Sequence, residues 1–215
     1  MAKTILITNM RDKQWNFSAV LGVFLATAWA FQISAEDGFM LNNSSSGEVK
    51  VLFDFRQSEQ AEQWYPIDDR VMGGISQSTF ESSENNTAIF TGKVSLENNG
   101  GFASVRMESD LFDLSHYSGI ILRVKSDGKD YNLNLKTDPN FSGVYFQAAF
   151  SPPADEWSTV KLPFSAFRAK IRGKYVDDQY ALNPADIRSF GFMISDKQNG
   201  PFQLQVDSIA AYREE

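Results

Sequence analysis

Apolar and polar residues alternate in short runs from Val51 to the end of the chain. In the first run, Val51, Phe53 and Phe55 occupy every second position, and the same alternation returns in residues 103–108, 120–125, 131–136, 144–150, 160–162, 190–194 and 202–206. A period of two is typical of strands with one buried face. Turn residues separate the runs, as in Asp138-Pro139-Asn140. About nine or ten short strands at this spacing predict an all-β fold, an antiparallel β-sandwich or jelly roll.

Helix is expected in only one or two short segments. Residues 58–64 have room for a turn or two. Asn183 followed by Pro184 has the pattern of an N-cap and a first helical residue, so a short helix is expected there as well.

The first 35 residues have the layout of a secretory signal peptide. Residues 17–33 carry no charge, Arg11 and Lys13 precede them, and small residues follow at cleavage-like spacing. The expected result is an exported, periplasmic protein, and the alternative is an uncleaved membrane anchor through residues 17–33. An organelle transit peptide fits less well, because such peptides are amphipathic rather than continuously apolar. Residues 36–50 then form a polar linker, and residues 51–215 form the domain.

Charge and cysteine content exclude several classes of function. The 215 residues carry a net charge of −7, and without the first 35 residues 17 basic residues face 26 acidic ones, a net charge of −9. Such a domain is not expected to bind nucleic acid, whose phosphates require positive charge. Contact with a membrane is expected only through the N-terminal segment. The absence of cysteine excludes disulfides, thiolate metal sites and a cysteine nucleophile.

Two glycine-bearing segments stand out from this pattern. They are residues 64–76, WYPIDDRVMGGIS, and residues 98–106, NNGGFASVR. Glycine pairs in strand-rich sequence mark bulges or close backbone approach. A phosphate-binding loop is not expected, because no helix follows either pair.

These segments resemble the signature of the complex I intermediate-associated protein 30 family. The family's Asp-Asp-x-Val-Met-Gly-Gly-x-Ser block corresponds to residues 68–76, and its Asn-Gly-Gly-Phe-x-Ser-x-Arg block to residues 99–106. A closing Asp-Lys-Gln-x-Gly-Pro-Phe block corresponds to residues 196–202, and the likeness covers residues 53–212. The resemblance implies a fold similar to the galactose-binding domain. It also implies a protein without catalysis or cofactor that helps to assemble NADH:ubiquinone oxidoreductase by binding a protein partner, such as a subunit of that respiratory complex.

The two segments supply the candidate binding surface. Its residues are Trp64, Asp68, Asp69, Arg70, Met72, Gly73, Gly74, Asn99, Gly100, Gly101, Phe102 and Arg106. For Asp68 and Asp69 three roles remain open: capping of loop backbone N–H groups, contact with a partner, or a shared Ca²⁺. Trp64 is either part of the core or an exposed anchor.

Catalysis is not expected. His116, the single histidine, lies in an expected loop, and no nucleophile, base or metal constellation can be assembled around it. A hydrolase built on carboxylates is the open possibility for an enzyme. The alternative function is a carbohydrate-binding module of the cell envelope, with a glycan bound by Trp64, Tyr65, Asn132, Asn134, Tyr145 and Gln147.

Overall fold

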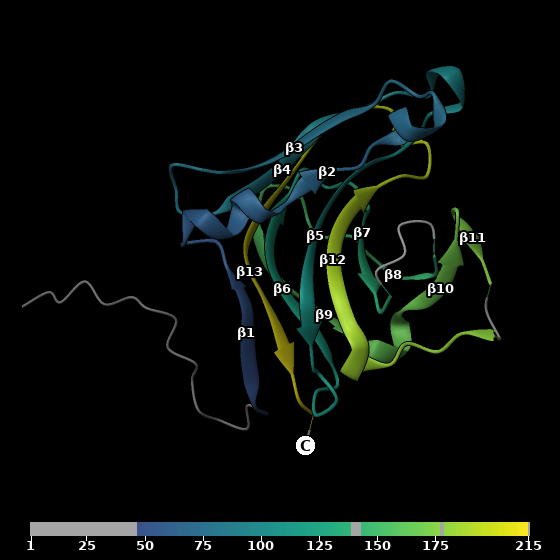
Figure 1. Ribbon diagram of the computed structural model, residues 1–215. Coiled ribbons are helices and arrows are strands. Elements are labelled where there is room, and N and C mark those ends of the chain that lie inside the picture. Colours follow the sequence, from purple (N-terminus) through teal and green to yellow (C-terminus); the bar gives the residue numbers. More distant parts are fainter. Residues whose placement is uncertain (1–46, 139–142, 177–178, 215) are drawn as a thin grey trace, which may run out of the picture. The chain divides into compact units, whose positions relative to one another are not determined.

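The computed structural model describes residues 47–138, 143–176 and 179–214. These residues form thirteen β-strands in two sheets, joined by short 3₁₀ helices (Figure 1). The strands pair antiparallel throughout both sheets. The predicted antiparallel β-sandwich is therefore confirmed.

The first sheet is built around one long strand, β13 (Gly200–Tyr212). On one side β13 pairs with β6 (Gly119–Ser126), which in turn pairs with β9 (Trp157–Pro163). On its other side the first half of β13 pairs with β4 (Ala88–Val94) and the second half with β1 (Val49–Asp54). The edge next to β4 is β3 (Gln77–Ser82).

The second sheet has seven strands. In order across the sheet they are β11 (Lys174–Tyr175), β10 (Arg168–Ile171), β8 (Tyr145–Phe150), β7 (Tyr131–Lys136), β12 (Ile187–Ile194), β5 (Ala103–Phe112) and β2 (Tyr65–Pro66). The short strand β2 lies near the start of the first glycine-bearing segment, and β5 begins within the second. This sheet therefore brings the two segments to the same edge.

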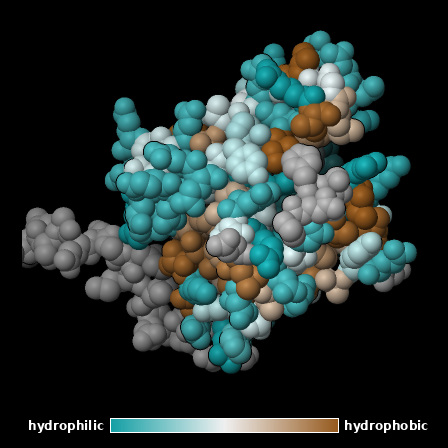
Figure 2. All heavy atoms as spheres, viewed as in Figure 1, coloured by the Kyte–Doolittle hydropathy of each residue, from teal (hydrophilic) through white to brown (hydrophobic). Residues whose placement is uncertain are grey.

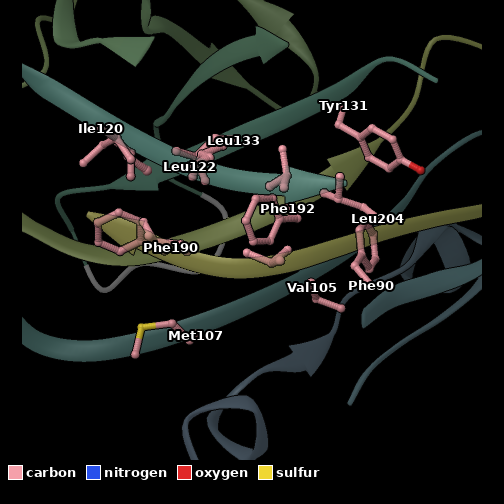
Figure 3. Close-up of a cluster of buried hydrophobic side chains, with 14 of the residues drawn as sticks. Phe90, Val105, Met107, Ile120, Leu122, Tyr131, Leu133, Phe190, Phe192 and Leu204 are labelled. Atoms are coloured by element: carbon pink, nitrogen blue, oxygen red, sulfur yellow. The ribbon is translucent and has the colours of Figure 1, made fainter. Parts of the chain in front are cut away.

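The core lies between the sheets, where the apolar positions of the alternating runs meet. Leu122 and Leu204 of the first sheet and Leu133 and Phe192 of the second are fully buried (Figure 3). Burial of a side chain of this size stabilises the fold by about 1.5–3 kcal/mol. The alternation that predicts the strands is thus the alternation that fills the core.

Trp64 lies in this core and not on a surface. Its side chain is 5% exposed, and its ring stacks on Phe80 of β3 with centroids 4.8 Å apart and on Phe192 of β12 at 5.5 Å. Phe53 of β1 meets the same ring edge-on at 5.5 Å. Trp64 therefore packs against both sheets. The prediction that it belongs to an exposed binding surface or a sugar platform is wrong.

The helical segments with bounds inside the described residues are short 3₁₀ helices. They are η1 (Ser58–Gln63), η2 (Asp69–Met72), η3 (Glu97–Asn99), η4 (Phe164–Ala166) and η6 (Pro184–Asp186). The two expected positions are confirmed, and at η6 the Asn183 side chain caps the Ala185 N–H. Among the described residues no helix is both long and apolar enough to cross a membrane. Residues 17–33, the expected signal or anchor, and most of the expected linker lie outside the described residues.

A carboxylate-centred loop pair as the candidate functional site

The two glycine-bearing segments are held together by the side chain of Asp69, the first residue of η2. Its Oδ1 accepts from the Ser76 N–H at 2.9 Å. Its Oδ2 accepts from the Ser76 hydroxyl at 2.5 Å, from the Gly101 N–H at 2.7 Å and from the Phe102 N–H at 3.3 Å. One carboxylate, 1% exposed, thus caps backbone donors of both segments.

Asp68 makes a second link, between the two sheets. Its Oδ2 accepts from the Ser78 N–H at 2.9 Å, and its Oδ1 accepts from the Ser78 hydroxyl at 2.7 Å and from the Ser104 N–H at 3.1 Å. Ser78 lies on β3, the edge of the first sheet, whereas Ser104 lies on β5 of the second. Asp68 therefore accepts a hydrogen bond from the Ser78 N–H of an edge strand, which would otherwise be free to pair with another strand.

Two of the four glycines are required by the space around the Asp69 carboxylate. A Cβ on Gly74 would lie 2.4 Å from the Asp69 Cγ, and a Cβ on Gly100 would lie 2.6 Å from the Asp69 Oδ2. At Gly73 and Gly101 it is the backbone conformation that requires glycine, since their φ angles of +93° and +143° are unfavourable for other residues. Gly74 and Gly100 are thus sites of close approach, as the sequence predicts, whereas the positive φ angles of Gly73 and Gly101 were not predicted.

Asp69 is held in its ionised form. Burial acts to raise the pKa of this carboxyl, but the hydrogen bond from the Ser76 side chain and those from the backbone N–H groups of Gly101, Ser76 and Phe102 outweigh it. The pKa of Asp69 is therefore lower than that of an ordinary aspartate. A charged acceptor strengthens each of these hydrogen bonds.

The hydrogen bonds decide between the roles expected for the aspartates. Four donors converge on Asp69 and three on Asp68, and a carboxylate has about four lone-pair positions. Little capacity is left for a Ca²⁺, which takes six to eight oxygen ligands. Within residues 47–138, 143–176 and 179–214, no three His, Asp or Glu side chains are grouped as a metal site would require. The capping role is confirmed.

Around this buried centre the two loops expose apolar side chains. Val71 is 63% exposed and Met72 71%, and Ile75 and Leu96 are also exposed. Figure 2 shows apolar groups among hydrophilic ones at the upper right, where η2 and η3 lie in Figure 1. We call Val71, Met72, Ile75 and Leu96 the apolar tip. Val71, Ile75 and Leu96 were not among the predicted site residues, because an isolated apolar residue in a loop carries no periodic signal.

The remaining predicted site residues lie around the apolar tip or away from it. Arg70, Gly73 and Asn99 are exposed on the same loops, and Phe102 is half-buried. Arg106 lies on β5, where its Nη1 is 3.6 Å from Glu108. The structure therefore gathers most of the predicted residues at one loop pair.

The residues expected to bind a glycan do not gather on one exposed surface. Asn132, Asn134, Tyr145 and Gln147 come from the neighbouring strands β7 and β8. Asn132 and Gln147 are buried, and the Gln147 Nε2 donates to the Asn134 Oδ1 at 2.9 Å. Tyr65 is 41% exposed on β2. With Trp64 in the core, the expected stacking platform is not assembled by these side chains.

Comparison with known proteins identifies the source of the signature. The profile of the family described as Complex I intermediate-associated protein 30 matches residues 53–206. The mouse protein named "Complex I intermediate-associated protein 30, mitochondrial" is 30% identical over 82% of this chain and 60% of its own length. The Drosophila melanogaster protein of that name is 27% identical over 76% of this chain and 62% of its own length. The chain thus spans about 60% of these curated relatives.

Solved structures support the fold independently. A family 11 carbohydrate-binding module from Clostridium thermocellum matches with a TM-score of 0.59 and 21% identity, over 79% of this chain and 98% of the module. At this identity the likeness concerns the fold alone, an antiparallel β-sandwich.

The expectation of an exported, periplasmic protein is wrong. The relatives from mouse, Drosophila melanogaster and Caenorhabditis briggsae are all named as mitochondrial. A basic start followed by an apolar run is typical of a secretory signal, but this pattern alone does not identify the compartment.

Proposed function

The chain belongs to the Complex I intermediate-associated protein 30 family, and from this membership we propose that it acts without catalysis, by binding a protein partner during assembly of a respiratory complex. Its relatives are named for association with an intermediate of complex I. The partner is a subunit or an intermediate of NADH:ubiquinone oxidoreductase. The two loops around Asp69 form the contact.

The observation that carries this proposal is the apolar tip on a rigid base. Exposed apolar side chains gathered on one surface are typical of contact sites for other proteins. Here they sit on loops whose backbone is fixed by Asp69 and Asp68. Loops ordered before binding lose less conformational entropy on association than mobile loops, which favours affinity.

The state of the two aspartates supports a role without catalysis. Every oxygen of Asp68 and Asp69 accepts a hydrogen bond from the protein itself. A general base or nucleophile needs a carboxylate that reaches a substrate. These carboxylates instead maintain the shape of the loops.

The test is complementation of a deletion strain. Cells that lack the protein receive the wild-type gene, a variant with Met72→Asp and Leu96→Asp, or the control Leu111→Asp. Leu111 is 49% exposed near the far end of β5, about 27 Å along the strand from the loops. Assembled NADH:ubiquinone oxidoreductase is measured by native electrophoresis, and co-purified subunits are identified by mass spectrometry.

We expect the double variant to fold normally, to lose the co-purified subunits and to leave the respiratory complex incompletely assembled. The Leu111→Asp control should restore assembly. Normal assembly in the deletion strain itself, with no subunit recovered by the wild-type protein, contradicts the proposal.

A further inference from the structure

An open groove of about 840 Å³ runs beside the apolar tip. It is lined by residues 65–68, 70 and 71, from β2 and the start of η2, and by residues of β3 and β4. Its size is that of sites that hold small ligands or short peptide segments. The groove and the apolar tip share Val71 and so form one continuous surface.

Two cations line this groove without a partner. Arg70 and Lys93 are both exposed, and neither side chain forms an ion pair or hydrogen bond within the described part of the chain. The domain carries a net negative charge, so two unpaired positive charges at one groove distinguish this part of its surface. The one carboxylate in the lining, Asp68, is already occupied by Ser78 and Ser104.

The other lining groups determine how a ligand is held. Tyr65, Ile67 and Val71 offer apolar contact, and Thr79 and Thr91 lie next to each other in the β3–β4 pair. Addition of a strand to β3 is blocked at Ser78, because its N–H is bound by Asp68. A ligand is therefore recognised by side chains and by charge rather than by extension of the sheet.

We propose that the groove binds an extended acidic segment of the assembly partner, with its carboxylates at Arg70 and Lys93 and its apolar side chains against Tyr65 and Val71. This inference rests on the proposed function, because the same partner covers the apolar tip. A nucleic acid is disfavoured, since its binding requires Lys and Arg contacts to many phosphates and the groove is lined by two cations.

Selection from a random library tests the ligand chemistry. Twelve-residue peptides are displayed and selected on the immobilised full-length chain, and enriched peptides are then titrated by fluorescence anisotropy. We expect the enriched peptides to carry more Asp and Glu than the library and to bind more weakly at higher salt. Because an exposed ion pair stabilises by up to about 1 kcal/mol, Arg70→Gln and Lys93→Gln should each weaken binding about 2- to 5-fold.

The double variant Arg70→Gln with Lys93→Gln should weaken binding about 5- to 20-fold. The matched control is Lys125→Gln, on β6 of the same sheet and outside the groove, which should change the affinity less than 2-fold. Lack of acidic enrichment, failure to select any peptide, or equal affinity for the double variant overturns the proposal. Displacement of bound peptide by a single-stranded oligonucleotide that binds more tightly also overturns it.

Failure of this inference can be distinguished from failure of the proposed function. A photo-crosslinking residue is placed at Thr79 in the groove or at Met72 on the apolar tip, and crosslinked partner peptides are sequenced. A respiratory subunit captured only from Met72 refutes the groove and leaves the assembly role standing. No subunit captured from either position counts against both, whereas an acidic peptide of that subunit captured from Thr79 supports the groove.

Discussion

Replacement of Asp69 by Asn tests the claim that one carboxylate holds the two loops. Asparagine has nearly the same shape but only one acceptor oxygen. In one orientation the amide oxygen accepts from the Ser76 N–H, and the amide NH₂ then points at the N–H groups of Gly101 and Phe102. In the other orientation the oxygen accepts from Gly101 and Phe102, and the NH₂ points at the Ser76 N–H. Hydrogen bonds to a charged group contribute about 1.5–3 kcal/mol each, and a buried donor left without an acceptor costs about 1–3 kcal/mol. We expect Asp69→Asn to lower the free energy of unfolding by about 3–5 kcal/mol.

The assay is urea unfolding followed by tryptophan fluorescence, because Trp64 lies in the core between the sheets. With an m-value of about 2 kcal/mol per M, the expected loss shifts the midpoint down by about 1.5–2.5 M. The control is Glu97→Gln, which removes an equal charge from the exposed surface of η3 and should stay within about 0.5 kcal/mol of wild type. A midpoint for Asp69→Asn within about 0.3 M of wild type, at unchanged m-value, would refute the reasoning.

Three further predictions concern the same centre and the core. Gly74→Ala should destabilise by about 2–4 kcal/mol through collision with Asp69, whereas Gly73→Ala, with nothing within 4 Å but a φ of +93°, should cost about 1 kcal/mol, both measured by urea unfolding. Trp64→Ala should lower the free energy of unfolding by about 3–5 kcal/mol. Trp64→Phe should lower it much less, because the indole N–H has no acceptor among the described residues and no hydrogen bond is lost. Thermal unfolding checks this, and equal losses of stability for the two variants would contradict it. Since the pKa of Asp69 is lowered by folding, its stabilising contribution is complete above the unfolded-state pKa near 4 and is lost as the pH falls through the lower folded-state pKa. Stability measured from pH 6 to pH 2 should therefore fall less steeply in Asp69→Asn than in wild type, and parallel curves would contradict the assignment.

Strand β7, which the alternation predicted, and strand β3, which it missed, differ in the residues at their inward positions. In β7 the inward residues Tyr131, Leu133 and Leu135 are all apolar, so the period of two is unbroken. Along the segment that leads into β3, the corresponding positions are Ser76, Ser78 and Phe80. The two serines are buried because they bond to Asp69 and Asp68. The polar cluster thus removes the hydrophobic signal of the strand next to it.

The candidate site was only partly visible in the sequence. The paired aspartates and glycines mark two unusual segments, and capping was among their expected roles. That Gly101 of one segment donates to Asp69 of the other depends on a contact across 32 positions, which no local pattern encodes. The same holds for Trp64, because a Trp beside a loop is as compatible with an exposed anchor as with a core position until Phe80 and Phe192 are placed around it.

The central position of β13 has a consequence for biosynthesis. Three strands, β1, β4 and β6, pair with residues 200–212, and Val49 pairs with Tyr212 at the far end of the described chain. The other edge of β4 pairs with β3, and the other edge of β6 pairs with β9. Pairings of such large sequence separation form slowly. In a nascent chain whose residues 200–212 have not yet emerged, one edge of each of these three strands is therefore unpaired. Unpaired strand edges are a hazard for aggregation. The first sheet therefore closes only after residues 200–212 have emerged, and until then the earlier strands need protection from aggregation.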